Sequence, residues 1–168
     1  MLFRSETGGG NFHRNAALNP DDVQGESDVY PHAVSNSEWA YAVKYAAKNV
    51  IDGKKPSGTE DIPCWSPNIR ADAFLEIDFG HEVALDAIAV SLAGDAEHTA
   101  FFESAVCAFS DGTQETLTFR PSTDEQRFSF DRRTTRYVRL SDFARPGAPD
   151  RCGIAEVECF GVSASARE

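Results

Sequence analysis

The stretch "FLEIDFGHEVALDAIAV", residues 74–90, decides how this sequence can fold. In its first half, Leu75, Ile77 and Phe79 alternate with acidic residues. Side chains on a β-strand point to opposite faces in turn, so a period of two indicates a strand with one buried and one solvated face. The sequence therefore predicts a half-buried β-strand here.

The same pattern resumes after Gly80–His81, where a turn is expected. Val83 and Leu85 keep the alternation, and the apolar positions then shift by one residue at Asp86–Ala87. Such a shift would send the later apolar side chains to the wrong face unless one extra residue is accommodated. We therefore predict a β-bulge or a corner at Asp86–Ala87.

Five further short stretches have strand character, and the turn signal "DGT" at 111–113 separates two of them. They are "ESAVCAFS" at 103–110, "ETLTF" at 115–119, "QRFSF" at 126–130, "RYVRLSDF" at 136–143 and "IAEVECFG" at 154–161. About eight strands joined by short turns predict an all-β protein, an antiparallel β-sandwich.

A different pattern precedes these strands. "SNSE" at 35–38 matches a capping box, in which a serine hydroxyl and a glutamate carboxylate cap free backbone N–H groups. Apolar residues then recur at helical spacing from Trp39 to Ala46. One short helix between Ser37 and Lys48 is expected.

The chain divides into three parts by composition. Residues 1–28 are polar with a glycine triplet and little periodicity, which predicts a flexible arm or linker. Residues 29–162 hold every strand pattern and form the single predicted domain, and residues 163–168 are a tail.

The net charge of −11 argues against several classes of partner, although it is also explained if the acidic surface only keeps the protein in solution. An acidic protein is not steered toward nucleic acid or an anionic membrane, whereas neutral sugars or cations fit it better. No apolar run approaches the ~20 residues that span a bilayer. The first residues carry no apolar core of a signal peptide, although a larger parent protein could supply one.

The four cysteines show no CxxC pair, which excludes a zinc ribbon or a thioredoxin motif. Cys107 and Cys159 lie in strand patterns and are expected to be buried thiols. Cys64 and Cys152 lie in predicted loops and are able to pair only in an oxidising compartment.

The order of the motifs resembles the discoidin or coagulation-factor C-type (F5/8 type C) domain of the galactose-binding-like superfamily, and is most similar to bacterial family 32 carbohydrate-binding modules. The matching pieces are "NVIDG" at 49–53, Trp65, the stretch at 74–90, "FSDGT" at 109–113, "RYVRLSDF" at 136–143 and "GIAEVECFG" at 153–161. They cover most of residues 33–161, and the resemblance implies a galactose-binding-like jelly-roll sandwich.

The resemblance also implies a structural Ca²⁺ ion in the loop after "NVIDG". Its ligands would be the carboxylates of Asp52 and Glu156, the backbone carbonyls of Asn49, Lys54 and Ala155, and the hydroxyl and carbonyl of Ser57. Calcium takes six to eight such oxygen ligands. The insert at 57–64 makes Thr59, Glu60 or Asp61 alternatives to Ser57, and a plain turn capped by Asp52 is the alternative to the metal.

A glycan site is expected at the loop "GDAEHTAFF", residues 94–102. Polar side chains that fix hydroxyl groups, beside an aromatic ring that packs on the apolar face of a pyranose, are what a sugar site needs. The candidate ligand-binding residues are Asp95, His98, Phe101 and Phe102, with Arg70 and Trp65 at the rim. For Trp65 and the two phenylalanines, burial in the core is the alternative, and His98 has the alternative of capping the loop.

We expect a noncatalytic carbohydrate-binding module, because the sequence has no nucleophile elbow, zinc-protease motif, P-loop or dinucleotide fingerprint. The expected ligand is a galactose-type or N-acetylhexosamine glycan. A protein-interaction or adhesion module on the same scaffold is the alternative. The module would belong to a glycosidase or surface protein, outside the cell or on its surface, with a cytoplasmic location as the alternative.

Overall fold

The computed structural model describes residues 13–57, 61–147 and 151–164. The elements are β2 (Arg14–Asn15), β3 (His32–Ser35), η2 (Trp39–Tyr41), η3 (Val43–Tyr45), η4 (Ala47–Ile51), β4 (Leu75–Leu92), β5 (Ser104–Phe109), β6 (Gln114–Thr118), β7 (Gln126–Ala144) and β8 (Ile154–Ser163), where η marks a 3₁₀ helix. The predicted all-β class is confirmed. None of the described helices is long and apolar enough to cross a membrane.

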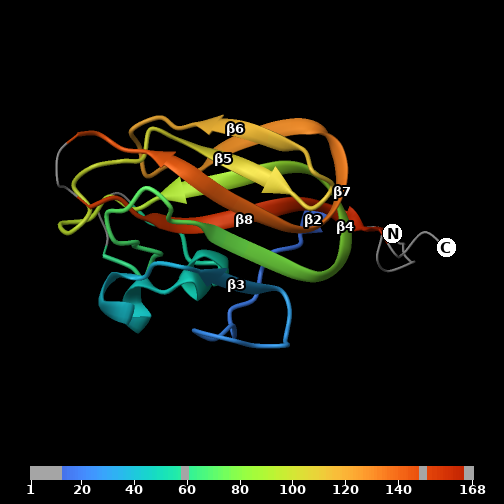
Figure 1. Cartoon of the computed structure of the whole chain (residues 1–168), viewed down its shortest axis with the longest axis horizontal. Coiled ribbons are helices and arrows are strands. Elements are labelled where there is room, and N and C mark those ends of the chain that lie inside the picture. The colour runs from blue at the N-terminus through green and yellow to red at the C-terminus, as the bar shows by residue number, and fades with distance from the viewer. Residues whose placement is uncertain (1–12, 58–60, 148–150, 165–168) are drawn as a thin grey trace.

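In the described residues, seven strands pair antiparallel in one sheet that bends into a sandwich (Figure 1). The first part of β4 lies between β3 and the last part of β7, and β5 and β6 continue this layer. The second part of β4 lies between β8 and the first part of β7, and β2 extends that layer. The two long strands, β4 and β7, therefore belong to both layers.

The bend in β4 falls where the sequence predicted a turn. The register to β7 shifts between Asp78 and Val83, and Gly80 has a φ of 79°. Glycine adopts this left-handed conformation at no steric cost. The chain therefore changes direction without reversing, so two predicted strands form one.

The predicted bulge is confirmed at Asp86. The register of β4 shifts between Leu85 and Ala87 toward both β7 and β8. The extra residue restores the inward direction of Ile88, whose side chain is buried. One buried face therefore runs through the whole strand.

Trp65 lies in the centre of the core with no exposed surface. Its ring packs against Phe102 and Phe143, with ring centroids 6.5 and 5.3 Å away, and its indole N–H donates to the carbonyl of Ser37 at 3.0 Å. Its backbone exchanges two hydrogen bonds with Ile154 at the start of β8. Trp65 thus fixes the end of the loop that follows η4 to the sandwich. Of the two possibilities for this residue, the rim of a sugar site or the core, the structure favours the core.

The predicted helix between Ser37 and Lys48 is wrong. The segment forms three 3₁₀ turns, separated by extended residues at Ala42 and Ala46. No side chain caps the first turn, since the Glu38 carboxylate instead accepts from the N–H of Ala47 at 2.8 Å. The glutamate of the supposed capping box therefore closes the following segment.

The described part of the predicted flexible arm, residues 13–28, packs on the sandwich. Arg14–Asn15 pairs with Phe160 and Gly161 of β8, and Ala17 is fully buried. Further along, the carboxylate of Asp22 lies 2.6 Å from the ring of His32 and accepts from the N–H of Ala33. The packed unit therefore begins upstream of residue 29, the predicted boundary, and residues 1–12 lie outside the described residues.

All four cysteines are buried and none forms a disulfide. Burial raises the pKa of the Cys64 and Cys107 thiols to about 12, and raises that of Cys159 well above its ordinary value. These thiols are core side chains, as predicted for Cys107 and Cys159.

Replacing Trp65 tests the central packing. Trp65→Ala should lower the free energy of unfolding by about 3–5 kcal/mol, because the cavity removes the contacts of a fully buried ring. Trp65→Phe should cost about 1–3 kcal/mol, mainly because the Ser37 carbonyl loses its donor. Urea unfolding measures both changes.

The control is Val43→Ala, since Val43 is 60% exposed. It should change the free energy of unfolding by no more than about 0.5 kcal/mol. A Trp65→Ala protein as stable as this control would contradict the central role of the ring.

Candidate functional site

The loops that carry the predicted site residues gather at one end of the sandwich (Figure 1). The loop 94–102 joins β4 to β5, and the segment 145–153 joins β7 to β8. Backbone hydrogen bonds join their roots, from Ala93 N–H to the carbonyl of Gly153 and from Glu103 N–H to the carbonyl of Ala144. The sheet therefore holds the roots of these two loops side by side.

A chain of buried hydrogen bonds runs under these loops. Arg151 donates from Nη2 to Ser66 Oγ at 3.0 Å, Ser66 Oγ lies 2.8 Å from His98 Nε2, and His98 Nδ1 lies 2.8 Å from Asp95 Oδ1. With the imidazole protonated at Nδ1, each group donates to the next. The chain ties both loops to the segment after Trp65.

Asp95 and His98 therefore lie beneath the loop surface, with 7% and 1% of their surfaces exposed. Burial opposes the charge of Asp95, but hydrogen bonds from His98 and from the backbone N–H groups of Glu97 and His98 lower its pKa. Both side chains fix the shape of the loop. The alternative in which His98 holds the loop fits this placement.

Ser66, His98 and Asp95 have the order of a nucleophile, a base and an orienting acid. Ser66 has no exposed surface, however, and Arg151 donates to the same oxygen that would have to attack. A catalytic serine must meet its substrate, so this group serves as an internal brace and not as a reaction centre.

Arg151, the first donor of this hydrogen-bond chain, also packs against aromatic rings. Its guanidinium lies 4.2 Å from the ring centroid of Trp39 and 4.6 Å from that of Tyr45. Tyr45 donates its hydroxyl to Glu97, and this bond, with the nearby charges of Lys44 and Arg151, lowers the pKa of Glu97. Two aromatic rings and one carboxylate thus hold the arginine in place.

The adjacent Phe101 and Phe102 differ in burial. Phe102 is 2% exposed and packs in the core, whereas Phe101 is half-buried against it, and both line a surface groove of about 460 Å³. The groove is lined by Thr99, Phe101, Glu103, Phe119, Pro121 and Pro146, among others. It combines an aromatic face with a hydroxyl and a carboxylate.

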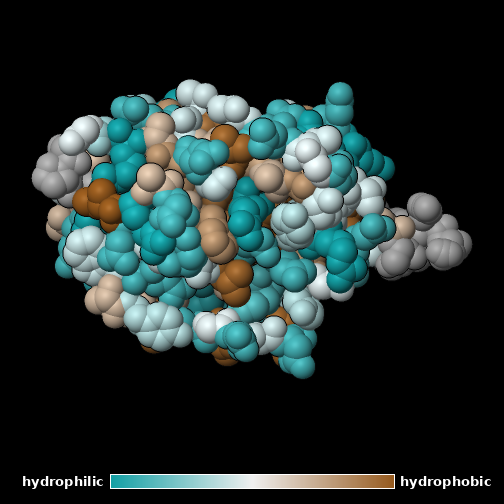
Figure 2. Space-filling view, in the orientation of Figure 1, coloured by the Kyte–Doolittle hydropathy of each residue, from teal (hydrophilic) through white to brown (hydrophobic). Residues whose placement is uncertain are grey.

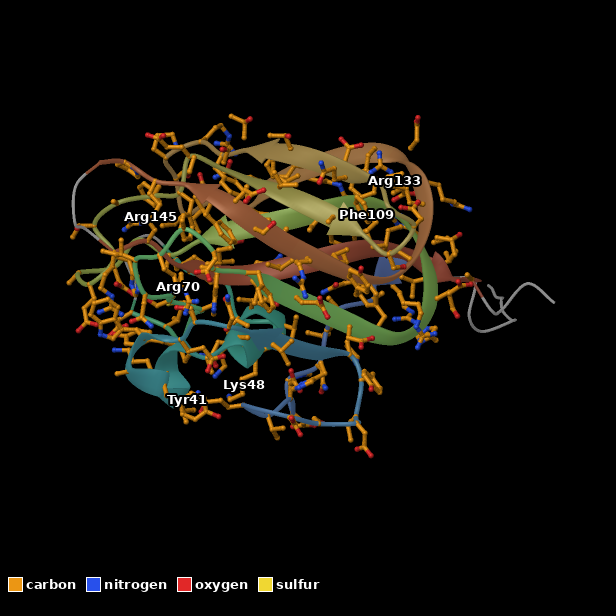
Figure 3. All side chains as sticks on the ribbon, in the orientation of Figure 1. Tyr41, Lys48, Arg70, Phe109, Arg133 and Arg145 are labelled. Atoms are coloured by element: carbon orange, nitrogen blue, oxygen red, sulfur yellow. The ribbon has the colours of Figure 1, made fainter. Side chains whose placement is uncertain are left out.

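Arg70 lies away from this groove. It forms a two-pronged ion pair with Asp72, at 2.5 and 2.8 Å, and donates to the backbone carbonyl of Asn36 at 3.3 Å. Arg70 and Arg145 are both labelled at the loop end in Figure 3. Neither Arg70 nor Trp65 lines the groove beside loop 94–102.

The predicted metal loop brings two carboxylates together. Asp52 ends η4, and Glu156 lies on β8 with 1% of its surface exposed. Burial and the neighbouring Asp52 carboxylate raise the pKa of Glu156 to about 10. Glu156 Oε2 accepts from Gly53 N–H at 2.8 Å, whereas its Oε1 is buried without a hydrogen-bond partner.

A bulge beside Glu156 involves Ala155, a further predicted ligand. Leu92 pairs with Ile154 and Ser91 with Glu156, so Ala155 is the extra residue on β8. A bulge residue is left out of the ladder, which frees its carbonyl for another partner. A buried orphan carboxylate oxygen, a second carboxylate and this bulge fit a hard cation such as Ca²⁺.

The remaining predicted ligands differ in burial. Lys54 and Ser57 are exposed, and Asn49 is buried with its side-chain amide donating to the carbonyls of Val43, Lys44 and Cys64. Thr59 and Glu60 lie outside the described residues, and Asp61 pairs with Lys44 at 3.2 Å. Asp52 also accepts a hydrogen bond from Lys54 N–H and so caps its turn. This is the contact expected if Asp52 only caps the turn and binds no metal.

The described residues hold no cluster of three or more His, Cys, Asp or Glu side chains arranged for a metal ion. The predicted calcium site uses only two carboxylates and takes its other ligands from backbone and hydroxyl oxygens. A site of this kind does not need three such side chains.

Ser66, Tyr45 and Arg151 were missed by sequence reasoning. Each bonds to a partner at least 32 positions away along the chain, and no local motif marks any of them.

No protein-family model matches the chain, and no curated protein matches it. Solved structures do. The chitosan-binding module 1 of a chitosanase/glucanase from Paenibacillus sp. IK-5 is 18% identical with a TM-score of 0.65, over 89% of this chain and 100% of that one.

Two other structures extend this likeness. A fucolectin from striped bass (Morone saxatilis) serum is 20% identical with a TM-score of 0.67, over 90% of this chain and 50% of that chain. The family 32 carbohydrate-binding module of C. perfringens NanJ, in complex with galactose, is 18% identical with a TM-score of 0.58, over 76% and 91%. The chain therefore shares the sandwich fold of these three proteins.

Proposed function

We propose that this chain is a noncatalytic glycan-binding module that holds a structural Ca²⁺ ion. The observation that carries the proposal is the half-buried ring of Phe101, which lines a groove beside the loop predicted for sugar binding. The groove volume of about 460 Å³ falls in the range of roughly 300–1,000 Å³ that small-molecule sites occupy.

The groove suits a neutral pyranose. The ring of Phe101 offers a flat apolar face to the C–H side of a sugar, while Thr99 and Glu103 offer a hydroxyl and a carboxylate to its hydroxyl groups. Asp95 and His98 contribute from below by holding the loop in shape. The similar structures include modules that bind galactose, fucose and chitosan, which supports a glycan of the galactose or N-acetylhexosamine type.

The protein-interaction alternative has less support. A protein interface would want a broad apolar patch. Figure 2 shows a mostly hydrophilic face on which the hydrophobic residues form small separate spots. With a net charge of −11, nucleic acid and anionic membranes are not proposed as partners. A glycosidase or surface protein outside the cell is the proposed parent.

The calcium proposal rests on Asp52 and Glu156. Without a cation, a buried carboxylate beside a second one is costly, and the raised pKa of Glu156 expresses this cost. A bound Ca²⁺ would satisfy Glu156 Oε1 and supply the positive charge that both groups lack. Its place beside the loop root, and not in the groove, makes its role structural.

Chelation tests the metal. The melting temperature should be higher in excess Ca²⁺ than with a chelator, since a ligand at a hundred times its Kd stabilises the folded state by about 2.7 kcal/mol. Asp52→Asn and Glu156→Gln should each abolish most of this difference. Thermal unfolding followed by circular dichroism measures it.

Asp72→Asn is the matched control, because Asp72 is an exposed carboxylate that pairs with Arg70 and is not among the predicted calcium ligands. It should keep the full calcium response. Equal melting temperatures of the wild-type protein in Ca²⁺ and in chelator would refute the calcium proposal.

Mutation of Phe101 tests the sugar groove. Galactose and N-acetylgalactosamine should shift the amide NMR signals of residues 99–103 with a Kd of roughly 10 μM to 1 mM, since one exposed sugar offers few contacts. Phe101→Ala should weaken binding about tenfold or more, because an aromatic platform carries a large share of such an interface.

Phe160→Ala supplies the control, since Phe160 is a half-buried phenylalanine on β8 that packs against Arg127 instead of the groove. It should bind the sugars as the wild type does. If several galactosides and N-acetylhexosamines leave residues 99–103 unshifted, the groove is not the sugar site.

A further inference from the structure

The backbone at Tyr41 is strained with no gain from burial. Ala40 and Tyr41 have φ values of 54° and 51°. This left-handed backbone conformation is unfavourable for every residue type that carries a Cβ atom. Tyr41 is nevertheless 66% exposed. Strain of this kind persists where the surrounding structure imposes it, and it often accompanies function.

The strained turn separates two aromatic residues. Trp39 packs under Arg151, whereas Tyr41, two positions later, lies at the outer edge of the loop end (Figure 3). Three hydrogen bonds hold the turn, from Tyr41 N–H to the Glu38 carbonyl, from Ala42 N–H to the Trp39 carbonyl, and from Gln24 to the Tyr41 carbonyl. The ring is therefore presented to solvent by a fixed backbone.

Two hollows flank Tyr41 and share Ser35, Glu38 and Tyr41 as walls. The first, of about 230 Å³, is lined by Gly25, Glu26, Val34, Ser35, Glu38 and Tyr41. The second, of about 250 Å³, is lined by Ser35, Asn36, Ser37, Glu38, Tyr41 and Asn68. An exposed aromatic ring thus stands between an acidic hollow and an amide-lined hollow.

Both hollows have rigid walls. On the acidic side, His32 bonds to Asp22 at 2.6 Å and to the Gly25 carbonyl at 2.7 Å, which fixes the turn that carries Glu26. The Glu38 carboxylate accepts from Gln24 at 2.7 Å. These groups need little rearrangement to receive a ligand, which favours binding.

On the amide side, neighbouring groups orient the side chains. Asn36 donates to the Asp72 carbonyl at 2.8 Å and accepts from Phe74 N–H at 2.9 Å. Asn68 donates to Ser37 Oγ at 3.2 Å. Arg70, which was predicted at the rim of the 94–102 site, instead donates to the Asn36 carbonyl and so stands beside this hollow.

We propose that Tyr41 is the platform of a second sugar-binding surface, which takes a pyranose that carries a protonated amino group. The ring of Tyr41 packs on the C–H face of the sugar, Glu26 and Glu38 face its ammonium group, and the amides of Asn36 and Asn68 bond to its hydroxyls. This inference rests on the proposed function in that both sites bind glycans. The two sites are separate, since they have no lining residue in common.

The amino group follows from the charges. Glu26 is exposed and Glu38 half-buried in the same hollow, and the chain has a net charge of −11. An ammonium group gains from two carboxylates, whereas an acetylated amine has no charge to pair with them. The ratio of the affinities for the amino sugar and for its N-acetylated form therefore measures the contribution of these two carboxylates.

The test titrates the chain with a glucosamine trisaccharide and, separately, with its fully N-acetylated form, while amide NMR signals are followed. The charged form should shift the signals of residues 25–26, 35–38, 41 and 68 and bind more tightly than the acetylated form. Tyr41→Ala should weaken binding at these signals about tenfold or more. Glu26→Gln should reduce the preference for the charged form about two- to fivefold.

Two further variants separate a binding role from a structural one. Val43→Ala removes an apolar side chain of similar exposure from the next turn and should leave binding unchanged. Tyr41→Gly relieves the strained backbone, so it should lose the sugar while keeping or raising the melting temperature. Wild-type affinity in Tyr41→Ala would overturn the inference.

The failures of the two proposals are distinguishable. If the glucosamine trisaccharide shifts residues 99–103 and not the Tyr41 set, this inference is wrong and the groove at Phe101 stands. If the Tyr41 set responds and residues 99–103 respond to no sugar, the second surface stands and the groove fails.

Discussion

The sandwich depends on two strands that each serve both of its layers. β4 pairs with β3 and β7 before Gly80 and with β8 and β7 after it. β7 runs the other way, so its first part pairs with β4 after Gly80 and its last part pairs with β4 before Gly80 and with β5. Neither layer has a complete set of partners without the other, so the sheet closes over its core as one unit. The bulge at Asp86 is part of this constraint, because it keeps Ile88 and the residues beyond it directed inward.

The loop end is built on the same strands but is held by polar groups. Trp65 bridges to Ile154, and the next residue, Ser66, joins the hydrogen-bond chain from Arg151 to Asp95. Gly153 makes this approach possible, since a Cβ there would lie 2.9 Å from the Trp65 carbonyl and 3.1 Å from the His98 ring. Buried polar groups of this kind are stable only when each has its partner, so the brace fixes loop positions sharply.

Sequence periodicity predicted the parts that depend on alternation. It located β4, the bulge and the buried Cys107 and Cys159, since each follows from a local pattern of two, and the turn signal at 111–113 located the hairpin between β5 and β6. It failed at residues 37–48, where apolar spacing suggested a helix but the segment turns three times to place Tyr45 inward and Tyr41 outward. Tertiary contacts decided that segment, as they did for Ala17 in the predicted arm.

The candidate site shows the same division. Which polar residues of loop 94–102 meet a ligand depends on partners such as Ser66 and Arg151, which no local pattern reveals. Once those partners bury Asp95 and His98, this end of the molecule still offers two rings on rigid supports, the half-buried Phe101 beside Thr99 and Glu103 in its groove and the exposed Tyr41 on its strained turn. A weak ligand such as a sugar gains most from surfaces that lose little freedom on binding. The buried polar brace and the two rings are therefore connected, because the internal hydrogen bonds supply the rigidity that the proposed sugar recognition requires.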